Sequence, residues 1–204
     1  MIAIIDYGVG NVGSIANMLQ KCGADSRICS SHDEIENADK LILPGVGSFD
    51  HGMRKLRELD LVSLLNFKVK QQNTPILGIC LGMQLFGERS EEGIERGLGW
   101  LDSESVKFRF DPLPGALKIP HMGWNYLEPG YGSNGSYGFD ASSRFYFVHS
   151  YHVVCRDPRD VLATTSYGYT FVSAVKNENI VGVQFHPEKS HRYGLNLLRH
   201  FAEL

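Results

Sequence analysis

The chain has 204 residues and a formal net charge of −3, with 43% hydrophobic and 21% charged residues. This balance is typical of a globular protein and argues against disorder, and no basic excess points to nucleic-acid binding. No apolar run is long enough to span a bilayer, and Met1–Asp6 has the pattern of a strand rather than a signal peptide, so we expect a cytoplasmic protein.

Short apolar runs alternate with helical periodicity in the first half of the sequence. The predicted strands are Ile2–Ile5, Ser26–Cys29, Lys40–Leu43 and Pro75–Cys80, and the predicted helices are Ile15–Cys22, Phe49–Gln71 and Leu81–Glu88. This alternation predicts an α/β fold with an open, mostly parallel, twisted sheet flanked by helices.

The second half of the sequence has a different pattern, in which short predicted strands are separated by turns. Strands are predicted at Val106–Phe110, Arg144–Val154, Val161–Ser166, Phe171–Lys176 and Ile180–Phe185, a surface loop at Pro129–Gly138, and a final helix at Tyr193–Glu203. We therefore expect additional antiparallel strands here. Without an internal repeat or a linker, residues 1–204 are predicted to form a single domain.

The segment Gly78–Gly82 reads Gly-Ile-Cys-Leu-Gly, the pattern of a nucleophile elbow with cysteine in place of serine. A strand that turns sharply into a helix leaves its central residue, Cys80, strained and exposed, and only glycine fits two positions away on each side. The helix start would stabilise a thiolate, and the N–H of Leu81 would face an oxyanion. A buried structural cysteine is the alternative, but the paired glycines favour a nucleophile.

A cysteine nucleophile needs a base and a group that orients the base. His186 follows the apolar run Val181–Phe185, and Glu188 comes two residues later. In an extended chain both side chains leave on the same face, about 6–7 Å apart at their α-carbons. Glu188 would then hold the His186 ring and support its imidazolium form.

The remaining histidines and cysteines show no comparable pattern. His149 and His152 lie in one strand-like run and are expected on opposite faces of it. No histidine has metal-ligand spacing, so neither a metal nor a cofactor is predicted. Cys22, Cys29 and Cys155 show no visible role.

Together these motifs resemble the class I (triad) glutamine amidotransferases, and within that family the glutaminase subunits of imidazole glycerol phosphate synthases. The resemblance extends over nearly the whole chain. Its supporting stretches are Ile4–Gly8, Leu43–Gly47, Gly78–Gln84, Pro120–Asn125, Tyr146–Tyr151 and Gly182–Ser190.

The resemblance implies a role for each of these stretches. Pro44–Gly47 would be an oxyanion strand in which an N–H near Val46 joins that of Leu81. L-glutamine would be contacted by Gly47, Gln84, Ser150 and Tyr151. The residues that would lie at the surface facing a synthase (cyclase) subunit, near an ammonia passage, are His121, Met122, Gly123, Trp124 and Asn125.

The resemblance also implies the reaction. Cys80 would attack the glutamine carboxamide, and His186 would protonate the departing ammonia and then activate water to hydrolyse the thioester. The ammonia would pass to the synthase subunit of a heterodimer that makes imidazole glycerol phosphate and AICAR in histidine biosynthesis. Partner binding would gate the oxyanion strand. Mild departures, such as Ser150 where threonine is common, leave open an alternative acceptor, a sugar amidotransferase in surface-polysaccharide synthesis.

Three further readings compete with this one. Gly8–Gly13 is a complete G-x-G-x-x-G with Asp33 about twenty residues beyond it, which is the dinucleotide-binding fingerprint. That hypothesis leaves Cys80, His186 and Glu188 unexplained. Cysteine elbows also occur in peptidases and chaperone-like hydrolases, but Gln84 favours the amidotransferase. A binding protein that has lost catalysis is disfavoured because all three triad residues are present.

Overall fold

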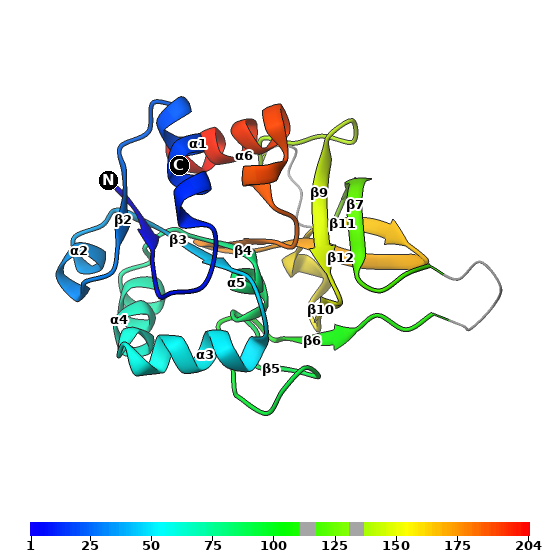
Figure 1. Cartoon of the computed structure of the whole chain (residues 1–204), viewed down its shortest axis with the longest axis horizontal. Coiled ribbons are helices and arrows are strands. Elements are labelled where there is room, and N and C mark those ends of the chain that lie inside the picture. The colour runs from blue at the N-terminus through cyan, green and yellow to red at the C-terminus, as the bar shows by residue number, and fades with distance from the viewer. Residues whose placement is uncertain (111–116, 131–136) are drawn as a thin grey trace.

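The parallel half of the main sheet is formed by five strands, in a computed structural model that describes residues 1–110, 117–130 and 137–204 (Figure 1). In spatial order they are β2 (Ser26–Cys29), β1 (Ile2–Ile5), β3 (Lys40–Gly45), β4 (Ile76–Cys80) and β13 (Ile180–Val183). Every neighbouring pair among them is parallel. The four inner strands are buried almost throughout, which is why their sequences are continuous apolar runs.

The sheet continues from β13 through mainly antiparallel strands. The continuation runs through β12 (Tyr169–Asn177), β10 (Tyr151–Cys155), β6 (Ser103–Lys107) and β5 (Arg89–Ser90). Two strands branch from it, since β11 (Val161–Tyr167) pairs with both β12 and β8 (Glu128–Pro129). A separate antiparallel pair is formed by β7 (His121–Tyr126) and β9 (Arg144–His149). The predicted α/β class with added antiparallel strands is confirmed.

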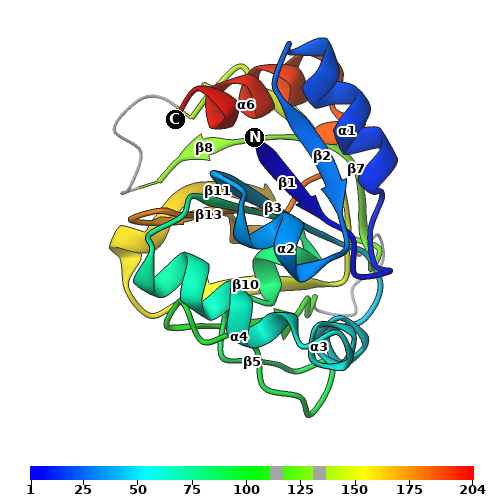
Figure 2. The ribbon, with the colours of Figure 1, turned by 90° about the vertical axis from the view of Figure 1, so that its left-hand side faces the viewer.

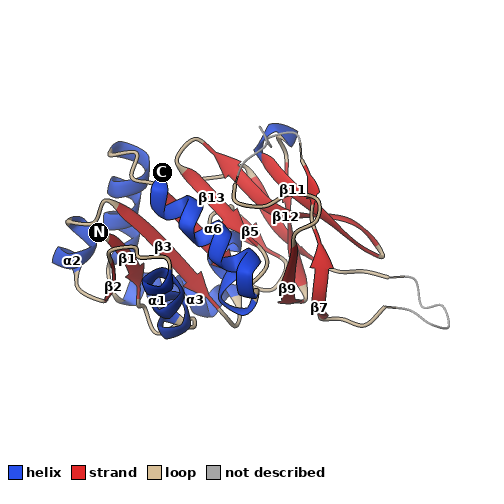
Figure 3. Cartoon of the chain, turned by 90° about the horizontal axis from the view of Figure 1, so that it is seen from above, coloured by secondary structure: helices blue, strands red, loops and turns tan. Residues whose placement is uncertain are grey.

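Helices cover both faces of the parallel half (Figures 2 and 3). On one face α1 (Val12–Lys21) packs against α6 (His191–Glu203). The opposite face carries α3 (Phe49–Glu58), α4 (Leu61–Asn66) and α5 (Leu81–Gln84), while the short α2 (His32–Glu36) contacts β1 and α4. A π-helical turn spans Phe67–Gln71, and 3-10 turns span Pro158–Asp160 and Pro187–Lys189.

Two hydrophobic clusters result from this layering. The α1/α6 side buries Ile15, Leu19, Leu197, Leu198 and Phe201 against β1, β3 and β4. The α3/α4/α5 side buries Phe49, Met53, Leu56, Leu65 and Leu85. Each cluster takes alternate side chains of the same strands, so the sheet is fixed from both sides and its carboxyl edge is held rigidly.

Several predicted elements are shorter, interrupted or displaced. The strand predicted at Val106–Phe110 lies at Ser103–Lys107, and the strand predicted at Ile180–Phe185 ends at Val183. The helix predicted at Phe49–Gln71 breaks at Asp60, whose φ of 52° is left-handed. The helix predicted at Leu81–Glu88 is only the single turn Leu81–Gln84. The strand predicted at Arg144–Val154 divides at Ser150 into β9 and β10, which belong to different sheets.

Several short elements were not predicted. These are α2, β5, β7 and β8. Pro129, predicted in a surface loop, is the last residue of β8, and residues 131–136 of that loop lie outside the described residues. Among the helices within the described ranges, none is long and apolar enough to cross a membrane.

Candidate active site

Cys80 lies at the carboxyl end of β4, where the chain turns directly into α5. Its backbone has φ 55° and ψ −109°, a combination that L-residues rarely adopt. Its neighbours across the sheet are β3 and β13, since Gly45 pairs with Cys80 and Val183 with Ile79. This is the strained strand-to-helix turn that the elbow motif predicts, at the edge where parallel sheets place their ligands. The prediction that Cys80 is exposed is wrong, because its side chain is only 7% exposed at the edge of the cavity described below.

The two glycines of the motif are required by packing. A β-carbon on Gly82 would lie 1.9 Å from the carbonyl oxygen of Leu43, and one on Gly78 would lie 2.6 Å from the Phe86 ring. Neither position has room for a side chain. The glycines therefore let α5 approach β3 and β4 closely enough to hold Cys80 in its strained conformation.

The neighbouring segment Pro44–Gly47 is fixed by contacts with Tyr7 and with the elbow. The buried hydroxyl of Tyr7 donates a 2.7 Å hydrogen bond to the Pro44 carbonyl oxygen. A β-carbon on Gly45 would lie 2.8 Å from both the Gly82 nitrogen and the Leu81 β-carbon, so this backbone touches the elbow directly. Val46 is exposed, and Gly47 has a φ of 98°, which favours glycine.

Two hydrogen bonds fix the backbone of His186. Its backbone N–H donates to the Tyr146 carbonyl at 2.9 Å, and its carbonyl accepts from the Ser190 hydroxyl at 2.6 Å. The Nδ1 atom lies 2.8 Å from Oε1 of Glu188, and both side chains are only 2% exposed. The backbone between them is a 3-10 turn and not extended as predicted, but the turn still brings the carboxylate to the ring.

The electrostatics of His186 favour its charged form. Burial opposes the imidazolium, but interactions with Cys80 and Glu188 outweigh that cost and raise the pKa of His186 to about 10. Among the described residues, Nε2 of His186 and Oε2 of Glu188 have no hydrogen-bond partner. Nε2 is thus available to exchange a proton, while Nδ1 is committed to Glu188.

Cys80 and His186 line one cavity of about 470 Å³. The cavity also holds every residue predicted to stabilise an oxyanion or to contact the substrate: Val46, Gly47, Leu81, Gln84, Ser150 and Tyr151. Leu81 begins α5, so its N–H has no partner within the helix. The structure thus brings together residues from four separate segments of the sequence.

Gln84 is more constrained than the sequence suggested. Its Nε2 donates to the Gln184 Oε1 at 2.9 Å and to the Tyr151 carbonyl at 3.2 Å, which uses both amide hydrogens. Only its carbonyl oxygen remains for a ligand. Gln184 in turn places its Nε2 3.6 Å from the Cys80 sulfur. Sequence reasoning missed Gln184, although a polar residue inside the apolar run before His186 was a usable signal.

The segment 121–125 is only partly at the surface. Along β7 the side chains alternate, so that Met122 and Trp124 are exposed at 61% and 43% while His121 is 3% exposed. The prediction that the whole segment lies at the surface is therefore wrong for His121. Gly123 and Asn125 are half-buried.

The histidines of β9 and β10 also differ from expectation. His149 and His152 were expected on opposite faces, but both rings pack against Phe108 and Phe171 because the chain changes sheet at Ser150. His149 lines the cavity, a second residue that the sequence analysis did not select.

The glycines of the G-x-G-x-x-G motif have a structural explanation. Gly13 lies inside α1, and a β-carbon on Gly10 would lie 3.0 Å from the Pro44 side chain. Gly10 therefore lets the first loop pack against Pro44–Gly47. Asp33 lies in the first turn of α2, four residues after β2 ends, and is exposed.

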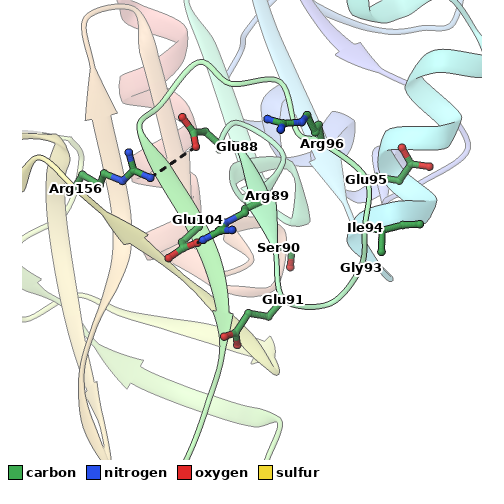
Figure 4. Close-up of a pocket in the computed structure, with 10 residues that line it drawn as sticks. All are labelled: Glu88, Arg89, Ser90, Glu91, Gly93, Ile94, Glu95, Arg96, Glu104 and Arg156. Atoms are coloured by element: carbon green, nitrogen blue, oxygen red, sulfur yellow. Dashed lines mark hydrogen bonds and ion pairs between the residues drawn. The ribbon is translucent and has the colours of Figure 1, made fainter.

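A second, larger pocket of about 630 Å³ lies at β5 and β6 and is lined mainly by charged side chains (Figure 4). Four of these charges pair within the pocket, since Arg89 contacts Glu104 at 2.7 Å and Arg156 contacts Glu88 at 3.9 Å. The nucleophile candidate is not among its residues. No group of metal-ligating side chains occurs in the described part of the chain.

Comparison with known proteins adds independent evidence. The family model for class-I glutamine amidotransferases matches residues 3–203. The imidazole glycerol phosphate synthase subunit HisH 2 of Methanococcus maripaludis is 55% identical over 203 residues, covering 100% of this chain and 99% of that protein. The subunit of the same name from Pseudomonas aeruginosa is 50% identical over 205 residues, with complete coverage of both.

Solved structures share the fold at lower identity. The structure of PurLQS from Thermotoga maritima has a TM-score of 0.69 at 17% identity, covering 99% of this chain and 97% of that one. The glutaminase domain of Trypanosoma brucei CTPS with bound acivicin has a TM-score of 0.66 at 17% identity, covering 99% and 93%.

Proposed function

Because the chain belongs to the class-I glutamine amidotransferase family, we propose that Cys80, His186 and Glu188 hydrolyse L-glutamine to L-glutamate and ammonia. One observation carries this proposal. A strained cysteine and a histidine bonded to a buried carboxylate line the same cavity, although they are about a hundred residues apart in the sequence. The set has the nucleophile, base and orienting group that covalent acyl transfer requires.

The reaction follows from the proton positions. Interactions with Cys80 and Glu188 raise the pKa of His186 to about 10, so its imidazolium is present at neutral pH in the same cavity as the Cys80 sulfur. The sulfur attacks the side-chain carbonyl of glutamine, and the N–H groups at Val46 and Leu81 bind the tetrahedral oxyanion. The Nε2 proton of His186 passes to the leaving nitrogen, which departs as ammonia and leaves a γ-glutamyl thioester.

The second half of the reaction regenerates the enzyme. Neutral His186 takes a proton through Nε2 from a water molecule, which attacks the thioester carbonyl. Collapse of this second tetrahedral intermediate releases glutamate and returns the sulfur as a thiolate. Glu188 keeps Nδ1 protonated throughout, so that Nε2 always carries the proton exchange.

We propose that the ammonia serves an imidazole glycerol phosphate synthase in histidine biosynthesis. The relatives at 50–55% identity are subunits of that synthase, and they match this chain end to end. We expect this chain to form a heterodimer with a synthase (cyclase) subunit, located in the cytoplasm. Its contact surface would include Met122 and Trp124 on β7, while His121 lies behind them. The alternative sugar acceptor gains no support from these relatives.

Nitrogen transfer tests this proposal. The purified chain is mixed with an imidazole glycerol phosphate synthase cyclase subunit, its nucleotide substrate and glutamine labelled with ¹⁵N at the amide. We expect label in the imidazole product even when glutamate dehydrogenase removes free ammonia from solution. Cys80→Ala should abolish the transfer, and Cys155→Ala, which changes a cysteine outside the cavity, should not. Label that appears only when the scavenger is omitted would contradict channelling to this partner.

A further inference from the structure

A chain of buried polar groups leads away from the Cys80 sulfur. Its first member is Gln184, which is fully buried and donates from Nε2 to Sγ at 3.6 Å. The Gln184 oxygen accepts from Gln84 at 2.9 Å, and the second amide hydrogen of Gln84 goes to the Tyr151 carbonyl at 3.2 Å. The nucleophile is thus tied to the backbone at the first residue of β10.

The chain continues through two histidines to β7. The Tyr151 carbonyl lies 2.7 Å from Nδ1 of His149, whose Nε2 lies 3.1 Å from Nδ1 of His121. Nε2 of His121 then lies 3.3 Å from the side-chain nitrogen of Asn125. Six consecutive contacts therefore join Cys80 to Asn125 on β7, which belongs to a different sheet.

Every donor and acceptor in this chain is determined. A carbonyl only accepts, so Nδ1 of His149 carries a hydrogen and its Nε2 accepts from Nδ1 of His121. Nε2 of His121 must then accept from Asn125. The Asn125 amide is oriented independently, because its oxygen accepts from the Tyr126 N–H at 2.9 Å and its nitrogen also donates to the Ser166 carbonyl at 2.9 Å.

The surroundings keep both histidines uncharged. Burial lowers the pKa of His149 to about 3 and that of His121 to about 4. The rings pack among Phe147 and Phe171, so little competing polar contact is available. A neutral, fully satisfied network of this kind fixes geometry because any rotation leaves a buried polar group unpaired.

We propose that this relay, from Asn125 through His121, His149, Gln84 and Gln184, positions the Cys80 sulfur and couples it to β7. Gln184 contacts the sulfur directly, whereas His149 and His121 act as positioning residues, since they reach it only through Gln84 and Gln184. The inference rests on the proposed function only in treating Cys80 as the nucleophile. Met122 and Trp124 follow His121 along β7 and are exposed, so a partner bound to them would act on the strand that carries His121 and Asn125.

The test measures the reactivity of Cys80 without glutamine. Iodoacetamide alkylation is followed from pH 5 to 10, and the Cys80 peptide is quantified by mass spectrometry to exclude the other three cysteines. Gln184→Met removes the donor to sulfur, and we expect alkylation at pH 7 about tenfold slower, with the midpoint about one pH unit higher. His121→Phe should shift the profile in the same direction by less.

Two variants make the test specific. His121→Asn keeps a donor at the position of Nδ1 and should restore alkylation to within about twofold of wild type. Thr165→Val is the matched control, since it replaces a buried hydroxyl that has no partner among the described residues. If His121→Phe does not fold, His149→Asn interrupts the relay at its next member while keeping the donor to Tyr151.

Coupling is read from the double variant Gln184→Met/His121→Phe. A relay predicts a combined slowing smaller than the product of the single effects, whereas independent sites give the product. An unchanged alkylation profile in Gln184→Met, or purely multiplicative effects in the double variant, would overturn the inference. If the wild-type chain with its partner releases no glutamate from glutamine while the alkylation shifts of the variants are observed, the proposed function fails and the relay stands, because alkylation does not require glutamine.

Discussion

Replacing Glu188 by glutamine isolates the contribution of its charge. The carboxylate is 2% exposed and holds Nδ1 of His186 at 2.8 Å through Oε1, while Oε2 has no partner among the described residues. The Glu188→Gln side chain has the same shape, so its oxygen can still accept from Nδ1. What disappears is the negative charge that stabilises the buried imidazolium.

The expected loss of activity follows from comparing a hydrogen bond to a charged group with one to a neutral group. A hydrogen bond to a charged group contributes about 1.5–3 kcal/mol and a neutral one about 0.5–1.5 kcal/mol, a difference of about 1–2 kcal/mol. This corresponds to a loss in kcat/KM of about 5- to 30-fold. The figure is a lower limit, because a rotated amide would donate to Nδ1 and impose the wrong tautomer.

The assay is steady-state glutamate release by the complex of this chain with a synthase subunit. It is combined with an NMR titration of the His186 ring, whose pKa should fall below that of the wild type. Glu203→Gln, the same change at an exposed position of α6, serves as the control. A kcat/KM within twofold of wild type, with an unchanged His186 titration, would refute the assigned role of Glu188.

Three further predictions concern the framework of the site. Gly82→Ala should lower the free energy of unfolding by at least about 1–3 kcal/mol in urea titrations and abolish activity, because the new β-carbon would lie 1.9 Å from the Leu43 carbonyl oxygen. Tyr7→Phe should cost about 1–3 kcal/mol in the same measurement, since it leaves the buried Pro44 carbonyl without its donor. The pKa of His149 is lowered to about 3 in the folded chain, so its contribution to stability is present above about pH 6.5 and is lost as the pH falls. Between pH 7 and pH 5 the wild type should therefore lose about 2 kcal/mol more than His149→Asn in urea unfolding, and equal losses would contradict the buried neutral imidazole.

The parallel half of the fold was predictable because burial on both faces leaves a direct signal in the sequence. Ile76–Cys80 is apolar throughout for that reason. The lengths of the helices were harder to predict from the sequence. The helix from Leu81 stops early because the carbonyls of Leu85 and Phe86 accept from the N–H groups of Leu98 and Trp100, contacts that no local periodicity reveals.

The catalytic candidates were predictable because the residues that react and the residues that their geometry requires lie within the same short motifs. Glycines beside Cys80 and a carboxylate two residues from His186 are visible without a structure. Gln184 and His149 were not selected, since their importance comes from contacts across separate strands. The burial of His121 could have been predicted, because β7 alternates strictly and a strand with one exposed face has one buried face.

The most direct measurement is the capture of the covalent intermediate. The chain and its synthase partner are mixed with glutamine, stopped in acid within the first turnovers, and digested for mass spectrometry. The mechanism predicts a γ-glutamyl thioester on the Cys80 peptide, absent in Cys80→Ala and accumulating in variants slowed in hydrolysis. Glutamate release without any adduct on Cys80, or with an adduct on another residue, would contradict the assignment of Cys80 as the nucleophile.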